Sequence, residues 1–310
     1  MAFTSASHWI RRKIGLTEVR REKLSLTTKR FGEIMWATVH HRMGGPGVAI
    51  LVFFVAVAIV GPWLPLPHWD ASLFPRTLDP SWEHPFGTDH LGRDLLSRVV
   101  RGSQVSLLVG FLASVIAGVL GTLVGLVTGF WGGWRDEVLM RINDVFLSLP
   151  WLALLIVLAA VLGGTLSLEV IIIVIGLTSW SFTARVVRAQ VLTVKERVFV
   201  ERARAAGAGN MTIIRKHIFP NVFPLVFANT ILTVAVAILS ESTLAFLGRV
   251  DRSNVSWGVI LSEAEESGAL LNGHWAWIVM PGLALVVVIF GFSLLGYALD
   301  EILNPKLRER

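Results

Sequence analysis

Cysteine is absent from the 310 residues of this chain, and charged residues make up only 16% of it. Without cysteine the chain has no disulfide framework, no thiolate chemistry and no cysteine-ligated metal site. With so few charges and 54% apolar residues, it has too little polar surface to cover a water-soluble globule of this length. The composition therefore indicates a membrane protein.

The sequence also lacks the motifs of common enzyme classes. No Gly-Lys pair occurs, which excludes the phosphate-binding motif G-x-x-x-x-G-K-S/T, and neither His-Glu-x-x-His nor G-x-S-x-G is present. His40 and His41 stand in a basic segment without neighbouring carboxylates, which is typical of solvated side chains rather than metal ligands. The sequence predicts a chain that is not an enzyme and has no catalytic, cofactor-binding or metal-binding residues.

Six apolar segments approach or exceed the roughly 20 residues that cross a bilayer. They are residues 47–65, 105–130, 145–162 with Pro150 inside, 170–187, 222–247, and 275–299 with an interruption at Pro281. A long acidic loop, residues 248–274, separates the last two. The sequence therefore predicts an all-α, polytopic membrane protein with six transmembrane helices.

The distribution of Lys and Arg predicts how these spans are oriented. Six spans place both termini on one side; if that side is the cytoplasm, 22 of the 28 Lys and Arg residues are internal and 6 external. Cytoplasmic loops carry such an excess. We expect a multi-pass protein of the cell membrane with both termini cytoplasmic, embedded in the lipid bilayer. Because the basic residues are sorted by membrane side, the high pI does not indicate a nucleic-acid partner.

Small residues recur every four positions in the second predicted span, at Ala113, Ala117, Gly121, Gly125 and Gly129. Residues four apart lie on one face of a helix. Small residues in register allow two membrane helices to approach closely. We expect a helix-packing ridge here, rather than the general glycine content of membrane helices.

Glu241 is the one ionisable residue in the interior of a predicted span, since Arg185 stands at the inner end of the fourth span, from which its side chain can reach the interface. A carboxylate at membrane depth costs a few kcal/mol, so it should face the bundle interior or a wet cavity. At about 1.5 Å per residue it lies about 30 Å along the helix from Pro220, near the outer leaflet. Two interpretations stay open: a role in the pathway or in helix packing, and a side chain close enough to the interface to be hydrated.

The longest strongly polar interruption between the spans runs from Arg197 to Pro224. It has the character of a helix that starts near Glu201 and of a second helix from Asn210, with Pro220 starting the next element. The small residues of the first helix are Ala203, Ala205 and Ala206, and Gly207 and Gly209 form a break after it. Small side chains on an exposed basic helix do not build a core, but they let another protein approach closely. An ordinary cytoplasmic loop is the alternative.

The pattern Glu201-x-Ala203-x-x-x-Gly207, followed about ten residues later by His217-Ile218-Phe219-Pro220, resembles the EAA loop of ABC-importer permeases. Arg202 stands where the family usually has alanine, and Phe219 where leucine is usual. Further segments resemble the C-type subunit of dipeptide, oligopeptide and nickel importers. They are HPFGTDHLGRDLLSR (84–98), GSQVSLLVG (102–110), GGWRDEVLMR (132–141), the stretch from Asp144 to Pro150, SESTLAFLG (240–248), SWG (256–258) and LNPKLR (303–308). The likeness covers roughly residues 45–308.

This resemblance implies a type I ABC importer permease fold. It implies cytoplasmic tails at 1–45 and 301–310, a first transmembrane helix with an external loop at 46–103, and a type-1 transmembrane core at 104–300. The loop at about 186–219 would be the coupling loop that sits in a groove of an ATPase subunit. The residues implied for this role are Glu201, Arg202, Ala203, Arg204, Ala205, Ala206, Gly207, Ala208 and Pro220.

The implied function is that of a permease subunit forming half of the translocation pathway for di- and oligopeptides. The implied partners are a homologous B-type permease, two ABC ATPase subunits and an extracytoplasmic peptide-binding protein. ATP and Mg would lie on the ATPase subunits, with no cofactor in this chain.

Alternatives remain at this point. Nickel, haem or another small solute stays open as the cargo. A stand-alone secondary transporter would need broken helices and charged groups at the membrane midplane, for which only Glu241 is a candidate. A membrane-embedded enzyme would need a metal site or a nucleophile with its base, and the sequence offers neither.

Overall fold

The computed structural model describes residues 32–303, and the predicted tails therefore lie largely outside the described residues. Within 32–303 the chain is helical apart from its loops and two isolated β-bridges, in agreement with the predicted all-α class. Residues 32–40 are helical. The further elements are α2 (Gly44–Val60), the short 3-10 helix η1 (Gly61–Trp63), α3 (Leu95–Trp131), α4 (Gly133–Ser148), α5 (Trp151–Val161), α6 (Leu168–Thr178), α7 (Trp180–Lys195), α8 (Val198–Ala205), α9 (Asn210–Ile213), the π-helix η2 (Ile214–Ile218), α10 (Phe219–Phe246), α11 (Trp257–Glu266) and α12 (Ala276–Leu303).

Five helical segments of the described chain are long and apolar enough to cross a membrane. They are Gly44–Trp63, Leu95–Trp131, Leu168–Lys195, Asn210–Phe246 and Ala276–Leu303. They match five of the six predicted spans, but each extends past a predicted limit. The second span begins at Leu95 because the Asp94 side chain accepts the N–H of Ser97 at 2.8 Å and caps the helix there. The domain boundary predicted at residue 104 therefore falls inside α3.

The third predicted span, residues 145–162, is wrong as a single straight helix. Helix α4 and helix α5 meet at 92°. Pro150 stands between them, and the residue before a proline is pushed out of the helical region; Leu149 accordingly has φ −78° and ψ 136°. With 11 residues, α5 is about 16 Å long, roughly half of a bilayer core. The prediction of six spans holds only if this bent pair counts as one.

Three other predicted features differ in the structure. The loop predicted at 186–219 is shorter, because α7 continues to Lys195. The acidic loop predicted at 248–274 contains the helix α11. Pro281 lies inside α12 near its start, so the predicted interruption of the last span does not occur.

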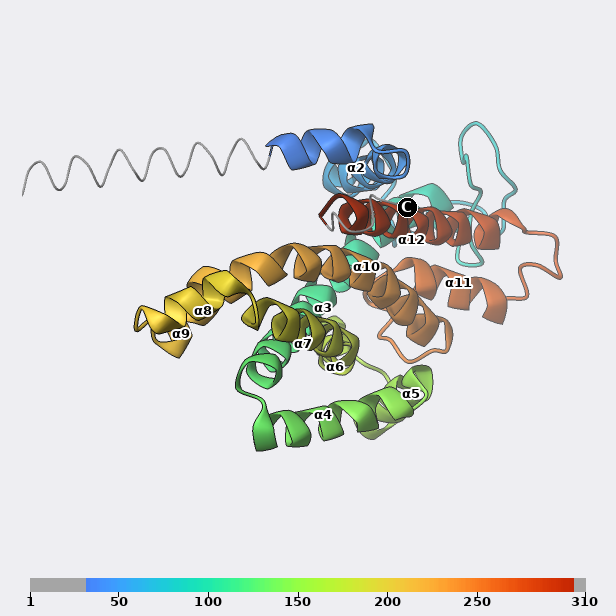
Figure 1. Ribbon diagram of the computed structural model, residues 1–310. Helices are drawn as coiled ribbons and strands as arrows, with labels where there is room; N and C mark the ends of the chain where they lie inside the picture. The colour runs from blue at the N-terminus through green and yellow to red at the C-terminus, as the bar shows by residue number, and fades with distance from the viewer. Residues whose placement is uncertain (1–31, 304–310) are drawn as a thin grey trace, which may run out of the picture.

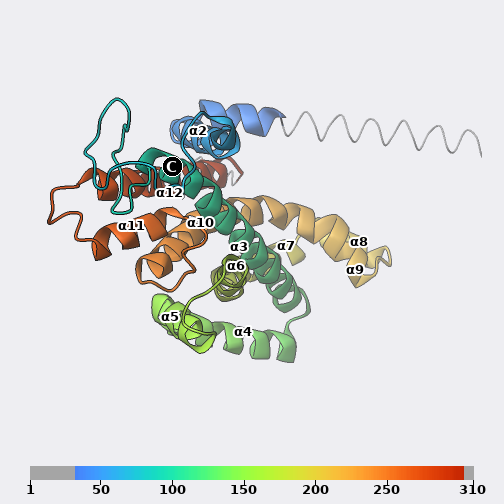
Figure 2. The ribbon, with the colours of Figure 1, turned by 180° about the vertical axis from the view of Figure 1, so that it is seen from behind.

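Helix α3 lies at the centre of the bundle, where it packs against α6, α7 and α10 (Figures 1 and 2). All five residues of the small-residue ridge are buried. A Cβ atom added to Gly125 would lie 2.6 Å from Val187 Cβ and 2.7 Å from the carbonyl oxygen of Ala184. The neighbours of Gly121, Gly125 and Gly129 are Thr183, Val187 and Val191. Since both sets advance by four residues, α3 and α7 run parallel with their backbones in close approach.

Replacing Gly125 by alanine is expected to destabilise the protein. The new methyl group would have to displace the Ala184 carbonyl, and overpacking of this kind costs about 1–3 kcal/mol. Gly282 in α12 is a matched control, because the nearest atom to an added Cβ there is Leu261 Cδ2 at 4.0 Å. Gly282→Ala should keep or raise the melting temperature, since alanine favours a helix over glycine. Equal melting temperatures for the two variants would contradict the close packing.

Helices α2 and α12 run antiparallel along one side of the bundle, with His41 Nε2 3.3 Å from Glu301 Oε2. Figures 1 and 2 both place this end of α2 and α12 on the same side of the molecule as α8 and α9. The long loop before α3 and helix α11 lie on the other side. The fold thus separates two ends: the α8–α9 end and the α11 end.

Candidate functional site

Helix α8 ends in a left-handed turn at Gly207, whose φ is 81°. The N–H of Gly207 donates to the Arg204 carbonyl at 3.0 Å, and the N–H of Ala208 donates to the Ala203 carbonyl at 3.0 Å. These two bonds form the Schellman motif, which stops a helix and satisfies its last carbonyls. Non-glycine residues reach this φ at a cost of about 1–2 kcal/mol. The turn itself therefore requires the glycine of the predicted loop pattern.

The loop formed by α8, α9 and η2 is anchored to three spanning helices. Val200, Ile213 and Ile218 are fully buried in one apolar cluster. The other members of that cluster come from α7 (Val187, Val191, Val194), α3 (Leu126, Phe130), η2 (Ile214) and the first half of α10 (Val222, Val226). Ala203 and Ala208 pack against its edge. A displacement of the loop is therefore transmitted to α3, α7 and α10 through close-packed side chains.

The opposite face of this loop is exposed. Glu201, Arg202, Arg204, Ala205 and Ala206 all lie on it, in the company of three exposed apolar side chains, Val198, Phe199 and Met211. Glu201 lies in the first turn of α8 and makes no ion pair with any residue of the described part, 32–303. Its carboxylate therefore has no arginine or lysine partner among these residues and is available to a partner protein.

Pro220 lies at the second residue of α10, where its missing N–H costs little. The helical path nevertheless continues backward through it from Phe246 to Asn210. The π-helix η2 makes this continuity feasible: Phe219 N–H donates to Ile214, five residues back. A π-helical turn contains one residue more than an α-helical turn, and such insertions often occur at functional sites. The α9–η2 part of the loop is thus the helical extension of α10.

Charged side chains missed by the sequence analysis tie α4 to this end of the molecule. Arg188 Nε and Nη2 donate to the two carboxylate oxygens of Asp136, each at 2.6 Å. Arg185 Nη2 donates to Asp144 at 2.5 Å. Bidentate arginine–carboxylate pairs fix the relative orientation of their elements. Only the appearance of Asp136 and Asp144 in segments that resemble a known family could have signalled these pairs.

A second cluster, also missed from the sequence, lies at the α11 end. Asp89 Oδ2 accepts from Arg93 Nε at 2.6 Å and from Arg98 Nη1 at 2.7 Å. Glu263 Oε2 lies 2.9 Å from Arg93 Nη2 and 2.7 Å from Arg98 Nη2. All four side chains are buried, and their formal charges cancel. This buried four-charge cluster joins the loop before α3, the first turn of α3, and α11.

Acid should weaken this cluster. Burial raises the pKa of Asp89, but the backbone N–H of Arg93 and the charges of Arg93 and Arg98 outweigh it, so the pKa lies below the ordinary value of 3.8. A carboxyl group with a lowered pKa stabilises the fold above its unfolded pKa and loses that contribution as the pH falls through the folded value. We expect the melting temperature of the detergent-purified protein to fall at pH values below about 4. An Asp89→Asn variant should start lower at neutral pH and fall less steeply; an equal acid slope would contradict this assignment.

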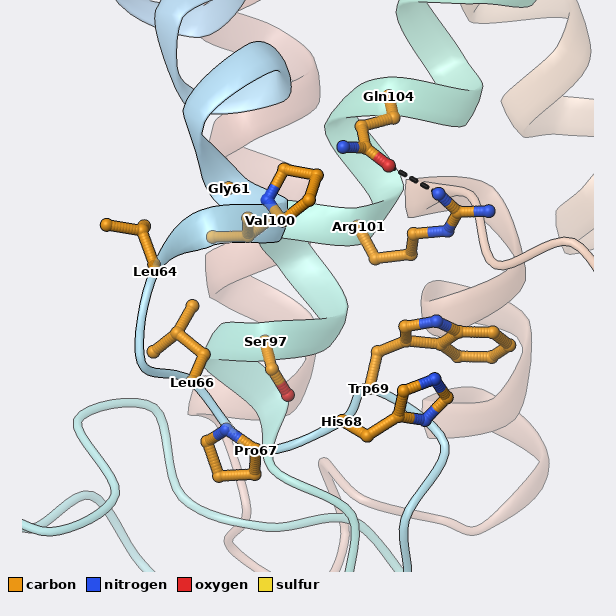
Figure 3. Close-up of a pocket in the computed structure, with 11 residues that line it drawn as sticks. Gly61, Leu64, Leu66, Pro67, His68, Trp69, Ser97, Val100, Arg101 and Gln104 are labelled. Atoms are coloured by element: carbon orange, nitrogen blue, oxygen red, sulfur yellow. Dashed lines mark hydrogen bonds between the residues drawn. The ribbon is translucent and has the colours of Figure 1, made fainter.

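A pocket of about 350 Å³ lies at the same end, between η1, the following loop and the start of α3 (Figure 3). Arg101 lies 5.8 Å from the centre of the Trp69 ring and donates to Gln104. Gln104 in turn donates to the Ala58 carbonyl at 2.7 Å. These contacts fasten the loop to α2 and α3, at the end of α3 opposite the α8 loop.

Glu241 lies inside the bundle, with 1% of its surface exposed. Its Oε2 accepts from Ser242 Oγ at 3.2 Å and lies 3.5 Å from Ser106 Oγ on α3. The Ser106 hydroxyl also accepts the N–H of Trp257 at the start of α11, at 3.3 Å. The interpretation of Glu241 as a hydrated residue near the interface is therefore wrong. Its place where α3, α10 and α11 meet favours a packing role, and the interpretation as a pathway residue stays a prediction.

Comparison of the sequence with known protein families assigns this chain to one of them. The sequence profile described as "Binding-protein-dependent transport system inner membrane component" matches residues 121–309, from the middle of α3 to the C-terminal segment. This chain belongs to that family. The match includes the α8–α9 loop and Glu241, and it makes the chain a multi-pass inner-membrane permease component, as the sequence resemblance implied.

Individual relatives extend the match over most of the permease. The dipeptide transport system permease protein DppC of Bacillus subtilis is 36% identical, and the alignment covers 94% of this chain and 89% of the relative. The protein of the same description from Alkalihalophilus pseudofirmus is 34% identical, covering 84% and 85%. A solved structure of the MetNI methionine ABC transporter in an inward-facing conformation has a chain with a TM-score of 0.54 and 22% identity, covering 68% of this permease and 97% of that chain. The last comparison supports the predicted type I ABC importer fold.

Proposed function

We propose that this permease is one half of the membrane pathway of an ATP-driven importer for di- and oligopeptides. The observation that carries the proposal is the exposed α8–α9 loop, which is rigidly joined to α3 and α7 in a chain whose 34–36% identical relatives are described as dipeptide permeases. The peptide cargo rests on those relatives.

The proposed partners follow from what this chain has and lacks. It has no nucleotide-binding motif, so ATP and Mg would be bound by two ATPase subunits, one of which receives the exposed face of α8. A homologous B-type permease would complete the pathway, and an extracytoplasmic binding protein would deliver the peptide. The excess of Lys and Arg on the α8 side supports a cytoplasmic position for that end and for both termini.

The geometry suggests how ATP would drive transport. Closure of the ATPase subunits on ATP would move the α8–α9 loop, and the apolar cluster beneath it would carry that movement to α3, α7 and α10. The outward- and inward-open states then form a two-state equilibrium that ATP shifts through contacts made differently in each state.

Reconstitution tests this function directly. Vesicles containing this chain, the homologous permease and the ATPase subunits should accumulate radiolabelled dialanine only with ATP inside and the binding protein outside. Uptake by this chain alone would favour a secondary transporter. ATP-dependent uptake of nickel or haem in place of dialanine would retain the importer and replace the cargo.

Replacing Glu201 by glutamine is expected to lower uptake at least tenfold. The unpaired carboxylate of Glu201 is expected to meet a donor in the ATPase groove, and loss of one partner of a desolvated interface pair costs about 2–5 kcal/mol. The matched control is the variant Glu196→Gln, because Glu196 is also exposed and lies just before α8. ATP-dependent uptake and the affinity for the binding protein should be measured together. Unaltered uptake in Glu201→Gln would leave Glu201 with a role only in starting its helix.

A further inference from the structure

A groove of about 280 Å³ lies where the bend between α4 and α5, the junction of α6 and α7, and the middle of α10 meet. Its walls include Trp151, Thr178, Ser179, Ser181 and Thr233, with Phe146 and Phe182 beside them. Ser181 lies near the middle of the segment Leu168–Lys195, and Thr233 near the middle of α10. Both helices cross the membrane, so the groove lies at about mid-bilayer depth.

Three polar groups of this groove differ from most hydroxyl groups of the spanning helices, whereas its Thr178 and Thr233 donate to carbonyls of their own helices. Most hydroxyl groups of the spanning helices donate to a carbonyl of their own helix, as Thr230 does to Val226 and Thr243 to Leu239. The hydroxyls of Ser179 and Ser181 and the indole N–H of Trp151 have no hydrogen-bond partner among the described residues, although they are shielded from solvent. Ser181 is 97% buried, with an exposed fraction of 3%. A buried polar atom without a partner costs free energy that a bound partner would recover.

Lipid is a poor occupant for such a groove. Hydrocarbon offers no hydrogen bonds, and interrupted helices at membrane depth are tolerated where they are covered by protein or line a polar cavity. Here one interruption is the 92° bend at Pro150, and the other is the residue Ser179 between α6 and α7. Polar groups inside a membrane bundle are typical of a solute pathway.

We propose that this groove contacts the peptide during its passage, with Ser179, Ser181 and Trp151 hydrogen-bonding its amide groups and the phenylalanines accepting its side chains. This inference rests on the proposed function. The groove wall has donors and acceptors without any Asp, Glu, Lys or Arg, so it fits the neutral, central part of a peptide. It has no carboxylate or imidazole ligand and is therefore poorly suited to bind a bare nickel ion.

Transport measured against ATP turnover tests the groove. The double variant Ser179→Ala, Ser181→Ala removes two unpartnered hydroxyls with little change in shape. With saturating loaded binding protein, dialanine uptake should fall about three- to tenfold, the effect of losing one or two hydrogen bonds, whereas stimulated ATP hydrolysis is retained. Since an unpartnered hydroxyl does not stabilise the fold, the melting temperature should not fall. The control is Ser114→Ala in α3, whose hydroxyl already donates to Phe111 at 2.8 Å.

Thiol labelling identifies the occupant, because the chain has no cysteine of its own. In the assembled importer, Phe182→Cys should react with a water-soluble methanethiosulfonate reagent, and dialanine delivered by the binding protein should slow the reaction. Phe290→Cys in α12, exposed like Phe182, should show no such protection. Reaction only with a lipid-soluble reagent, or no reaction because the partner permease covers the groove, would overturn the inference. Failure of the unaltered importer to take up dialanine would overturn the proposed cargo and this inference together, whereas normal uptake and labelling without protection would overturn the groove alone.

Discussion

A Gly207→Trp variant is expected to insert in the membrane normally but to lose association with the ATPase subunits. Two costs combine at this position. Tryptophan at a φ of 81° strains the backbone by about 1–3 kcal/mol, and the Schellman turn that ends α8 would have to change. In addition, the bulky ring would occupy the exposed surface that a partner must approach. We expect the affinity for purified ATPase subunits, measured in detergent, to fall more than a hundredfold.

Two further variants separate the two costs. Gly207→Asn should retain most of the association, because asparagine visits the left-handed region more readily than other residues do. Ala206→Trp adds the same bulk where the backbone is unstrained, at φ −76°. If only the approach of a partner matters, Ala206→Trp blocks association as Gly207→Trp does. Normal ATPase association and stimulated hydrolysis in both tryptophan variants would refute the docking role of this loop.

Replacing Arg98 by methionine is expected to cause the largest loss of stability. Arg98 is fully buried, and its removal would leave Asp89 and Glu263 with a single arginine between them. Breaking a buried ion pair from one side costs about 3–5 kcal/mol, because the remaining charge is left without a partner in a medium of low polarity. Thermal unfolding in detergent at neutral pH measures the effect.

The matched control is Arg252→Met, which removes a surface pair with Glu266, where the side chains are 48% and 49% exposed. Exposed pairs contribute only about 0–1 kcal/mol, so this variant should melt close to the parent protein. Adding Glu263→Met to Arg98→Met should recover part of the loss, because the second change removes a carboxylate left short of positive charge. Equal melting temperatures for Arg98→Met and Arg252→Met would show that the four-charge cluster does not stabilise the fold.

The sequence by itself determined the class of the protein, most of its spans and the place of the exposed loop. These features depend on local chemistry: runs of apolar residues long enough for a bilayer, the sorting of Lys and Arg, and small residues at helical spacing. The glycine in the loop pattern was also found locally. The sequence predicted a break of the helix there and a small residue for close approach, and the structure shows that the break is a left-handed turn that ends α8.

Only the tertiary structure decided the features that join residues distant in the chain. The 92° bend shows why: hydropathy continues across Pro150 as if one helix passed through it, and only the folded backbone shows that the two helices diverge. Glu263 lies 170 residues from Arg93 in sequence, and no periodicity relates them. The position of Glu241 along one helix left open whether its side chain is hydrated or packed inside the bundle, and only the structure shows that Ser106 and α11 cover it. Burial and charge pairing depend on which elements pack together, and a pattern along a single helix does not contain that information.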